Sequence, residues 1–548
     1  MIKRRRLIAG ATLAAAMPLA RPAIGSRAKT LSMVPQAVLN TIDPVWSSAQ
    51  VVRNMGFMVF ETLYGRDEHM NPHPQMLEFG LMEDGGKRWT LKLREKQMFH
   101  DGTPVLARDC IASLRRWARR DPAGATLMAR TDEMAATDDR TIVLRLNKPF
   151  PHLPELLSKF VVPAVMMPER LAMTDPFKQI PEAIGSGPFR FVHNEHVLGS
   201  HAVFAKNENY VPRDEKPSWT AGGRRVLVDR VEWKMIPDGG TAVNALMTGE
   251  IDWIEIPLPD LIGPLRKATG IKTGHLDTYG QIMALRLNHL AYPTSNPAIR
   301  QAMMAAIDQR EVMIAIMGGD PENWSVPMGF MATGKKEVDE AGLDRIRTRR
   351  PVAEIKSMLE KAGYKGERMA LLHATEHTFY NPASLIIAQQ LKEAGLNVDD
   401  QPMDWGTVQS RRTNRGQINE GGWSMFPTVT PVPDNRSPLT SSFTRGNGKD
   451  AFFGWPEDAE IERMYHQWLE VSDPAEQTRL ERAYQLRSFD VLPYIPLGRY
   501  LQSSAWRENV TGILKGPSVV FWNISKGSCG GGGGAPRASP FAPTARPG

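Results

Sequence analysis

The chain has few cysteines and no long apolar run beyond its start. Its 548 residues include only two cysteines, Cys110 and Cys529. They lie in such different settings that we expect no disulfide, so stability must come from burial. No stretch after the first 25 residues approaches the roughly 20 consecutive apolar residues that cross a bilayer, and we expect a soluble protein. One core rarely exceeds about 250–300 residues, so we expect at least two lobes.

Motifs of catalysis are also missing. The sequence contains no Gly-x-Ser-x-Gly elbow, no His-Glu-x-x-His and no phosphate-binding Gly-x-x-x-x-Gly-Lys-Ser/Thr. His69 and His73 have helical spacing, but the prolines around them break any helix that could align them. His193, His196 and His201 have no cysteine partner. We therefore expect no enzyme, no resident metal and no cofactor, with an exported hydrolase as the alternative.

The body of the chain has no excess of either charge. The net charge of +7 comes from the two ends. Residues 1–25 carry five basic residues and no acid, and the segment after Lys526 carries Arg537 and Arg546 without an acid. A nucleic-acid-binding protein would gather Lys and Arg on one face of its body. The sequence therefore predicts no nucleic-acid partner.

Residues 1–25 read as an export signal. A basic segment, Lys3-Arg4-Arg5-Arg6, precedes an apolar run from Leu7 to Leu19, and Ala23-Ile24-Gly25 places small residues before a cleavage site at Ser26. The arginine triplet also resembles a twin-arginine signal, so both ordinary and twin-arginine export stay open. The first cysteine is Cys110, so no lipid anchor is expected. We predict an unanchored protein of the bacterial periplasm.

Strand-like and helix-like runs alternate, which predicts α/β lobes with helix-covered sheets. The expected strands lie at 90–93, 141–146, 189–192 and 226–235, and the expected helices at 109–117, 296–306, 352–361, 383–393 and 474–490. Asn296-Pro297 is typical of a helix start. The stretch 427–438 is so rich in proline that we expect a long ordered loop there. The glycine-rich segment 527–548 is predicted to be a disordered tail.

A series of short motifs resembles a known family. Phe99-His100-Asp101-Gly102-Thr103-Pro104 is followed by Gly185-Ser186-Gly187-Pro188-Phe189 and Asn207-Glu208-Asn209-Tyr210, then Thr248-Gly249-Glu250-Ile251-Asp252 and Tyr494-Ile495-Pro496-Leu497. Their order along the chain is similar to that of bacterial extracellular solute-binding proteins of the peptide/nickel type, family 5. Two of these motifs also have a local structural interpretation. Asp101-Gly102 is typical of a turn, and the glycines at 185 and 187 allow a tight backbone crossing.

The resemblance implies a fold and a function. The fold would be that of a class II periplasmic binding protein, an α/β protein with two hinged lobes, a ligand cleft and an inserted domain. We expect lobe I at 27–55, 186–275 and 506–526, the inserted domain at 56–185, and lobe II at 276–505. The function would be delivery of a small peptide-like or amino-acid-derived solute to the permease of an ABC importer at the inner membrane. A ligand-presenting sensor is a further alternative, and a monomer is expected.

The resemblance also points to the ligand site. In the family, a segment that ends in a Gly-Trp pair contacts the ligand, and here it runs from Trp405 through Arg412 to Trp423. Large aromatic side chains provide contact area with little loss of entropy. The predicted ligand-binding residues are Trp46, Trp405, Arg412, Trp423, Phe426, Asp434 and Trp455.

One departure from the family pattern bears on the ligand. Peptide-binding members carry, three residues after that tryptophan, an aspartate that pairs with the peptide's α-ammonium, and this chain has Phe426 there. An aromatic ring offers apolar contact or a cation–π face in its place. We therefore expect a ligand whose recognition does not need a free α-ammonium at this position. In the competing view, Asp434, Glu420 or Asp404 supplies the charge.

Overall fold

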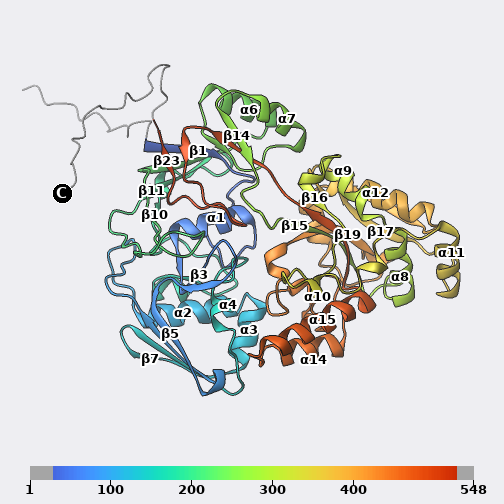
Figure 1. Cartoon of the computed structure of the whole chain (residues 1–548), viewed down its shortest axis with the longest axis horizontal. Coiled ribbons are helices and arrows are strands. Elements are labelled where there is room, and N and C mark those ends of the chain that lie inside the picture. Colours follow the sequence, from blue (N-terminus) through green and yellow to red (C-terminus); the bar gives the residue numbers. More distant parts are fainter. Residues whose placement is uncertain (1–28, 528–548) are drawn as a thin grey trace, which may run out of the picture.

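A computed structural model describes residues 29–527 of the chain. Three sheets organise it, with seven, six and four strands (Figure 1). The seven-stranded sheet stands at one end of the long axis and the six-stranded sheet at the other, with the four-stranded sheet beside the first (Figure 1). The predicted signal at 1–25, Cys529 and all of the predicted tail except Gly527 lie outside the described residues.

The seven-stranded sheet has a mixed topology. Its order is β10-β11-β12-β1-β13-β21-β14, and β1 runs parallel to both β12 and β13. Helices α6 (Gly239–Thr248) and α7 (Pro259–Lys267) pack beside its β13 and β14 ends, and α1 (Gln50–Val59) lies near β10. The strands are β1 (Thr30–Val34), β10 (Phe189–Phe191), β11 (His201–Lys206), β12 (Arg230–Lys234), β13 (Trp253–Ile254), β14 (Ile271–Gly274) and β21 (Ser504–Arg507).

The six-stranded sheet has the order β16-β20-β15-β19-β17-β18. Its middle strand β15 is buried at every residue. Helices α8 (Pro297–Ala306), α9 (Gln309–Met317), α11 (Val352–Lys361) and α12 (Tyr380–Glu393) pack around it, and α14 (Ala459–Trp468) and α15 (Pro474–Val491) form a pair at its lower side (Figure 1). The strands are β15 (Gln281–Leu287), β16 (Trp324–Ser325), β17 (Met369–Ala374), β18 (Val398–Met403), β19 (Met425–Pro431) and β20 (Tyr494–Tyr500).

Strand β19 overturns the prediction of a loop at 427–438. Its residues pair with β15 over their whole length, from Gln281↔Pro431 to Leu287↔Met425. Pro427 and Pro431 are four residues apart, so their nitrogens point to the same side of the strand. The neighbour on the other side, β17, pairs with Met425 alone. That side is therefore open beyond Met425, and the prolines remove no ladder bond there. The irregular part begins only at the short helix Val432–Asn435.

The four-stranded antiparallel sheet has the order β5-β6-β8-β7. Helix α2 (Ala107–Ala118) packs on it, and α3 (Pro122–Ala129), α4 (Leu153–Leu157) and α5 (Glu169–Ala172) lie near α2 and the sheet. The strands are β5 (Leu77–Glu83), β6 (Arg88–Leu93), β7 (Thr131–Asp138) and β8 (Thr141–Leu146). Short pairs β2–β9 (Glu61–Thr62, Val165–Met166), β3–β4 (Tyr64–Arg66, Pro72–Pro74) and β22–β23 (Val510–Thr511, Ser525–Lys526) complete the strands.

Several local predictions are confirmed. The amide of Ala298 donates to Asn296 Oδ1 at 2.9 Å, and Pro297 opens helix α8 as expected. Helix α11 has the predicted bounds, and α15 begins at the predicted Pro474. The tight crossing at Gly185 and Gly187 is also present, because a Cβ there would lie 2.2 Å from Val59 O and 2.5 Å from Met58 O. Neither glycine has a positive φ, so close approach and not dihedral freedom requires them.

The chain passes between the two large sheets twice. It leaves β14 at Gly274 and enters β15 at Gln281, and it returns from Tyr500 of β20 to Ser504 of β21. We retain the predicted division into lobe I, inserted domain and lobe II as a proposal, since nearly every strand of each sheet comes from one of those ranges. Within residues 29–527, no helix has the length and apolar character to cross a membrane.

Candidate functional site: a cleft between the lobes

A cavity of about 980 Å³ opens between the two large sheets. Its wall on the seven-stranded side includes Val34–Ala37 and Ile256–Leu258, and its wall on the six-stranded side includes Glu376–Tyr380 and Thr428–Pro431. Arg120, Asp121 and Lys159 of the inserted domain close a further side. A cleft between lobes is a common place for a small-molecule site, and this volume is at the upper end of such sites.

Arg412 is the most unusual side chain of this wall. It directly follows helix α13 (Trp405–Arg411), and its guanidinium lies 5.6 Å from the ring of Trp405 and 4.5 Å from that of Phe453. Within residues 29–527 the guanidinium makes no hydrogen bond and no ion pair, and its Nε is buried without a partner. Burial lowers the pKa of Arg412. The cleft therefore contains a cation that has aromatic contacts but no hydrogen-bond or ion-pair partner among the described residues.

Asp434 is the buried acid of the same wall. It lies in the short helix after β19, is 7% exposed, and no described group donates a hydrogen bond to its carboxylate. Burial raises its pKa to about 6, while the charges of Lys159, Arg53 and Arg66 work against this rise. All three cations come from the other side of the cleft. Asp434 thus lacks a direct partner and has a cationic surrounding.

The other cations that line the cleft have partners. Lys159 forms an ion pair with Asp121 of the inserted domain. Arg445 pairs with Glu462 through two hydrogen bonds of 2.9 and 2.6 Å. Arg53 donates from Nε to Ser518 Oγ at 2.7 Å and burial lowers its pKa to about 10. These groups are held by the protein itself, in contrast to Arg412.

The predicted residues fall into two groups. Trp405, Arg412 and Asp434 line the cavity. The other four side chains lie behind its wall. Trp423 and Phe426 are fully buried, with ring centroids 5.0 Å apart, and Trp455 packs on Trp423 at 5.9 Å. The part of β19 that reaches the cavity begins only at Thr428, two residues beyond Phe426. Trp46 lies under the guanidinium of Arg120, which lines the cavity in its place.

Trp423 still supports the site. Its indole nitrogen donates to the backbone oxygen of Arg412 at 3.2 Å, so this ring fixes the end of helix α13 from behind. The competing acid Glu420 is exposed and accepts from the amide of Gln417 at 3.2 Å, outside the cavity. Asp404 caps helix α13 through Thr407 N at 2.9 Å and does not line the cavity either.

Sequence reasoning missed an aromatic group on the same wall. His377 stacks on Tyr380 with ring centroids 3.6 Å apart, and Tyr380 lies 4.9 Å from Trp405. Burial lowers the pKa of His377 to about 4, so this ring is neutral at neutral pH. Phe452 completes the group at 5.9 Å from the Arg412 guanidinium. Tyr380 and Phe452 lie 25 and 47 residues from Trp405 in the sequence, and no local pattern links them.

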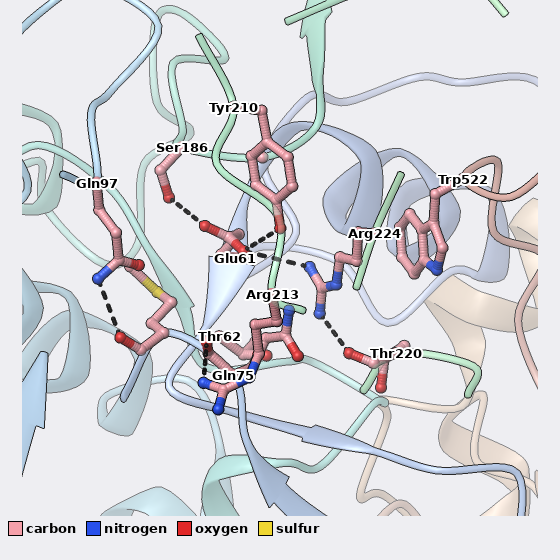
Figure 2. Close-up of polar contacts among 12 residues, drawn as sticks. Glu61, Thr62, Gln75, Gln97, Ser186, Tyr210, Arg213, Thr220, Arg224 and Trp522 are labelled. Atoms are coloured by element: carbon pink, nitrogen blue, oxygen red, sulfur yellow. Dashed lines mark hydrogen bonds and ion pairs between the residues drawn. The ribbon is translucent and has the colours of Figure 1, made fainter. Parts of the chain in front are cut away.

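Two of the family-like motifs serve the junction between the inserted domain and lobe I, away from the cleft. Figure 2 shows Tyr210 and Ser186 directed at Glu61, with hydrogen bonds of 2.8 and 3.2 Å. Arg224 lies 3.9 Å from the same carboxylate, donates to Thr220 O at 2.7 Å and covers the face of Trp522. None of these residues lines the cavity, so the motifs are structural.

Comparison with known proteins agrees with this architecture. A family model described as bacterial extracellular solute-binding proteins, family 5 middle, matches residues 71–450. The probable peptide ABC transporter periplasmic-binding protein y4tO of Sinorhizobium fredii is 34% identical over 95% of this chain and 98% of its own length. The glutathione-binding protein GsiB of Escherichia coli K12 is 25% identical over 88% of this chain and 91% of its own length.

Solved structures show the same fold. The binding protein AgaA of A. tumefaciens R10, in complex with agropinic acid, has a TM-score of 0.78 at 20% identity and covers 91% of this chain and 99% of its own. A dipeptide-binding protein of Pseudoalteromonas in complex with Met-Leu has a TM-score of 0.72 at 18% identity, with 91% and 100% covered. The fold is the predicted α/β class II binding-protein fold. The chain belongs to family 5 of the bacterial extracellular solute-binding proteins.

Proposed function

We propose that this protein binds a small amino-acid-derived solute through a carboxylate and delivers it to the permease of an ABC importer. The observation that carries the ligand class is the unpartnered guanidinium of Arg412 in the cavity wall. A half-buried guanidinium whose buried Nε has no partner is unfavourable, and a ligand carboxylate would reduce that penalty through charge-assisted hydrogen bonds. The surrounding rings of Trp405, Tyr380 and Phe452 fit the apolar part of such a ligand.

The surroundings of Asp434 narrow the proposed class of ligand. An ammonium at this carboxylate would also meet the positive charges of Lys159, Arg53 and Arg66. A neutral N–H or O–H donor would satisfy the carboxylate without that repulsion. Together with the burial of Phe426, this supports a ligand that needs no free α-ammonium, such as an acylated or conjugated amino acid. The opposing possibility, a free amine at Asp434, makes the reverse prediction for acetylated ligands.

The names of the relatives agree with the carboxylate in this proposal. They refer to a peptide, to glutathione and, for AgaA, to agropinic acid. Peptides and glutathione carry carboxylates, and agropinic acid is an acid by name. Similarity to these proteins supports the class of ligand for this chain and leaves the individual compound open.

Further parts of the proposal follow from the family. The protein would bind without turnover, act as a monomer in the periplasm without a lipid anchor, and bind no nucleic acid. A ligand recovered chemically altered, at a rate that depends on protein concentration, would favour the hydrolase alternative. Neighbouring genes for permeases and ATPases would favour import over a sensor role.

The test of the ligand class compares a dipeptide with its N-acetylated form by calorimetry. We expect acetylation to change the dissociation constant by less than about tenfold, because no acid at position 426 reads the amine. A loss of more than about 2–3 kcal/mol, the size expected for removing a charged hydrogen bond and stranding its partner, would show that an acid reads the amine.

A further inference from the structure

A second contact joins the inserted domain to lobe II, outside the cavity. It brings α3 and the start of α4 against helix α14 and the turn after it. In Figure 1 this contact lies in the lower half of the molecule, whereas the two chain connections between the sheets, beside β14, β15 and β16, lie in the upper half. A rotation about those connections would therefore separate this contact.

His152 is the centre of the contact. Its ring stacks on Trp468 of α14 with centroids 4.0 Å apart and planes at 16°. Its Nε2 lies 3.2 Å from Trp468 O and 3.0 Å from Val471 O, so this nitrogen must carry the proton and donate to the end of helix α14. Only 9% of His152 and 3% of Trp468 are exposed. Separation of the lobes would expose both rings and leave the two carbonyls without this donor.

Polar contacts surround the stacked rings. Arg130 lies 3.2 Å from Glu470 and donates from Nη2 to His466 O at 3.4 Å. Tyr465 donates to Thr126 of α3 at 3.4 Å. The apolar side chains behind these contacts form one hydrophobic cluster across the boundary, with Leu127 and Leu153 on one side and Met464 and Leu469 on the other.

None of the residues that make this contact lines the ligand cavity. The contact therefore joins the two lobes without touching a ligand. The apparent affinity of a binding protein scales with the fraction of molecules that already have the conformation that binds ligand. A contact that raises this fraction before ligand arrives therefore raises the apparent affinity. The ring stack, the hydrogen bonds and the ion pair of this contact would favour the conformation in which the lobes lie together.

We infer that the contact of His152 and Arg130 with helix α14 and Glu470 is a latch that keeps the two lobes closed before ligand arrives. Its residues act on ligand affinity from a distance, as positioning residues for the closed form. The effect on affinity rests on the proposed function, but the effect on the shape of the ligand-free protein does not.

The test is small-angle scattering of the ligand-free protein. The variants are His152→Leu, which keeps apolar bulk but removes the ring stack and the donor, and Glu470→Gln at a partly exposed position. The matched control is Arg140→Gln, because Arg140 pairs with Glu78 and Glu95 inside the inserted domain, each at 3.0 Å. Thermal melting of each variant shows that it is folded.

We expect the ligand-free wild-type protein to give the scattering curve calculated from this structure. His152→Leu and the double variant with Glu470→Gln should have a larger radius of gyration, and Arg140→Gln should match the wild type. An open ligand-free wild type, or variants as compact as the wild type, would overturn the latch. Because no ligand is present, these results do not depend on Arg412. If His152→Leu fails to fold, Glu470→Gln alone decides.

Discussion

Two regions of the molecule differ in whether an arginine has an ion-pair partner. One is the junction between lobe I and the inserted domain, and the other is the wall of the ligand cleft. At the junction, Arg116 of α2 donates to both carboxylate oxygens of Asp43, at 3.2 and 2.7 Å, and to the backbone oxygens of Thr174 and Lys178. In the cleft, the guanidinium of Arg412 has no such partner among the described residues. Arg116 is buried, whereas Arg412 is half-buried with a buried Nε.

The presence of a partner distinguishes charges that stabilise the fold from charges that are available to bind a ligand. A buried charge pair is costly to break from one side, because the remaining ion stays in a place of low dielectric. A charge without an ion pair contributes only its contacts with neighbouring side chains, and its removal also removes a desolvation penalty. Substitution of Arg116 should therefore destabilise the protein strongly, whereas substitution of Arg412 should change its stability little.

The largest effect is expected from Arg116→Ala. It would strand Asp43, which is fully buried, and should lower the free energy of unfolding by about 3–5 kcal/mol. Urea unfolding measures this. Arg145→Ala is the control, since its ion pair with Glu133 is exposed on both sides, and should cost no more than about 1 kcal/mol. Similar losses for the two variants would remove the contrast between buried pairs and surface pairs.

Asp434→Asn should have a smaller and pH-dependent effect. Burial raises the pKa of Asp434 from 3.8 to about 6, so its contribution to stability is present below pH 4 and is lost as the pH rises through 6. A shift of about two pH units corresponds to roughly 3 kcal/mol. The asparagine variant lacks this loss, so its stability relative to the wild type should rise by about that amount between pH 4 and pH 7.

Unfolding curves of the wild type and Asp434→Asn at the two pH values provide the check. Asp277→Asn is a second buried site for comparison, because burial raises that pKa as well, but Asp277 accepts from the amides of Tyr279 and Gly280 at 2.9 and 3.0 Å. Both bonds end on Oδ1, an acceptor that asparagine retains, so the stability of this variant relative to the wild type should also rise with pH. A pH-independent difference at position 434 would mean that Asp434 is satisfied in a way that the structure does not show.

The smallest effect on stability is expected from Arg412→Gln. The substitution removes a desolvated cation and a cation–π contact with Trp405 and Phe453, and these two contributions oppose each other. The free energy of unfolding should change by less than about 1 kcal/mol or increase. A loss above about 2 kcal/mol, measured in the same urea series, would place Arg412 among the charges that hold the fold.

Much of the fold could be predicted from local sequence. Asn296-Pro297 marked a helix start by a mechanism that the structure reproduces, and the glycines at 185 and 187 marked a backbone crossing. The prolines of 427–438 led to the wrong prediction of a loop. Whether a proline removes a hydrogen bond from the sheet depends on which side of β19 lacks a neighbouring strand. That depends on the length of β17, which the sequence around 430 does not encode.

The site was predictable only in part, for a similar reason. The segment 405–426 could be selected by resemblance and Asp434 as an alternative acid, and Trp405, Arg412 and Asp434 line the cavity. Which aromatic rings of a segment face a cavity and which face a core depends on strand alternation and on neighbouring helices. Trp423 and Phe426 lie behind the wall, while Tyr380 and Phe452 reach the cavity from other parts of the chain. Contacts at such sequence separations carry no local signal.

The most direct test of the central claim, that Arg412 waits for a ligand carboxylate, is calorimetry on the wild type and Arg412→Gln. The probes are the carboxylate that raises the melting temperature most in a panel of amino-acid derivatives, together with its primary amide. We predict that amidation weakens binding to the wild type by at least about tenfold, the scale of one charge-assisted hydrogen bond, and that Arg412→Gln binds acid and amide equally weakly. A wild type that binds the amide as tightly as the acid, a variant that still prefers the acid, or a panel in which only cationic or neutral compounds stabilise the protein would contradict the account.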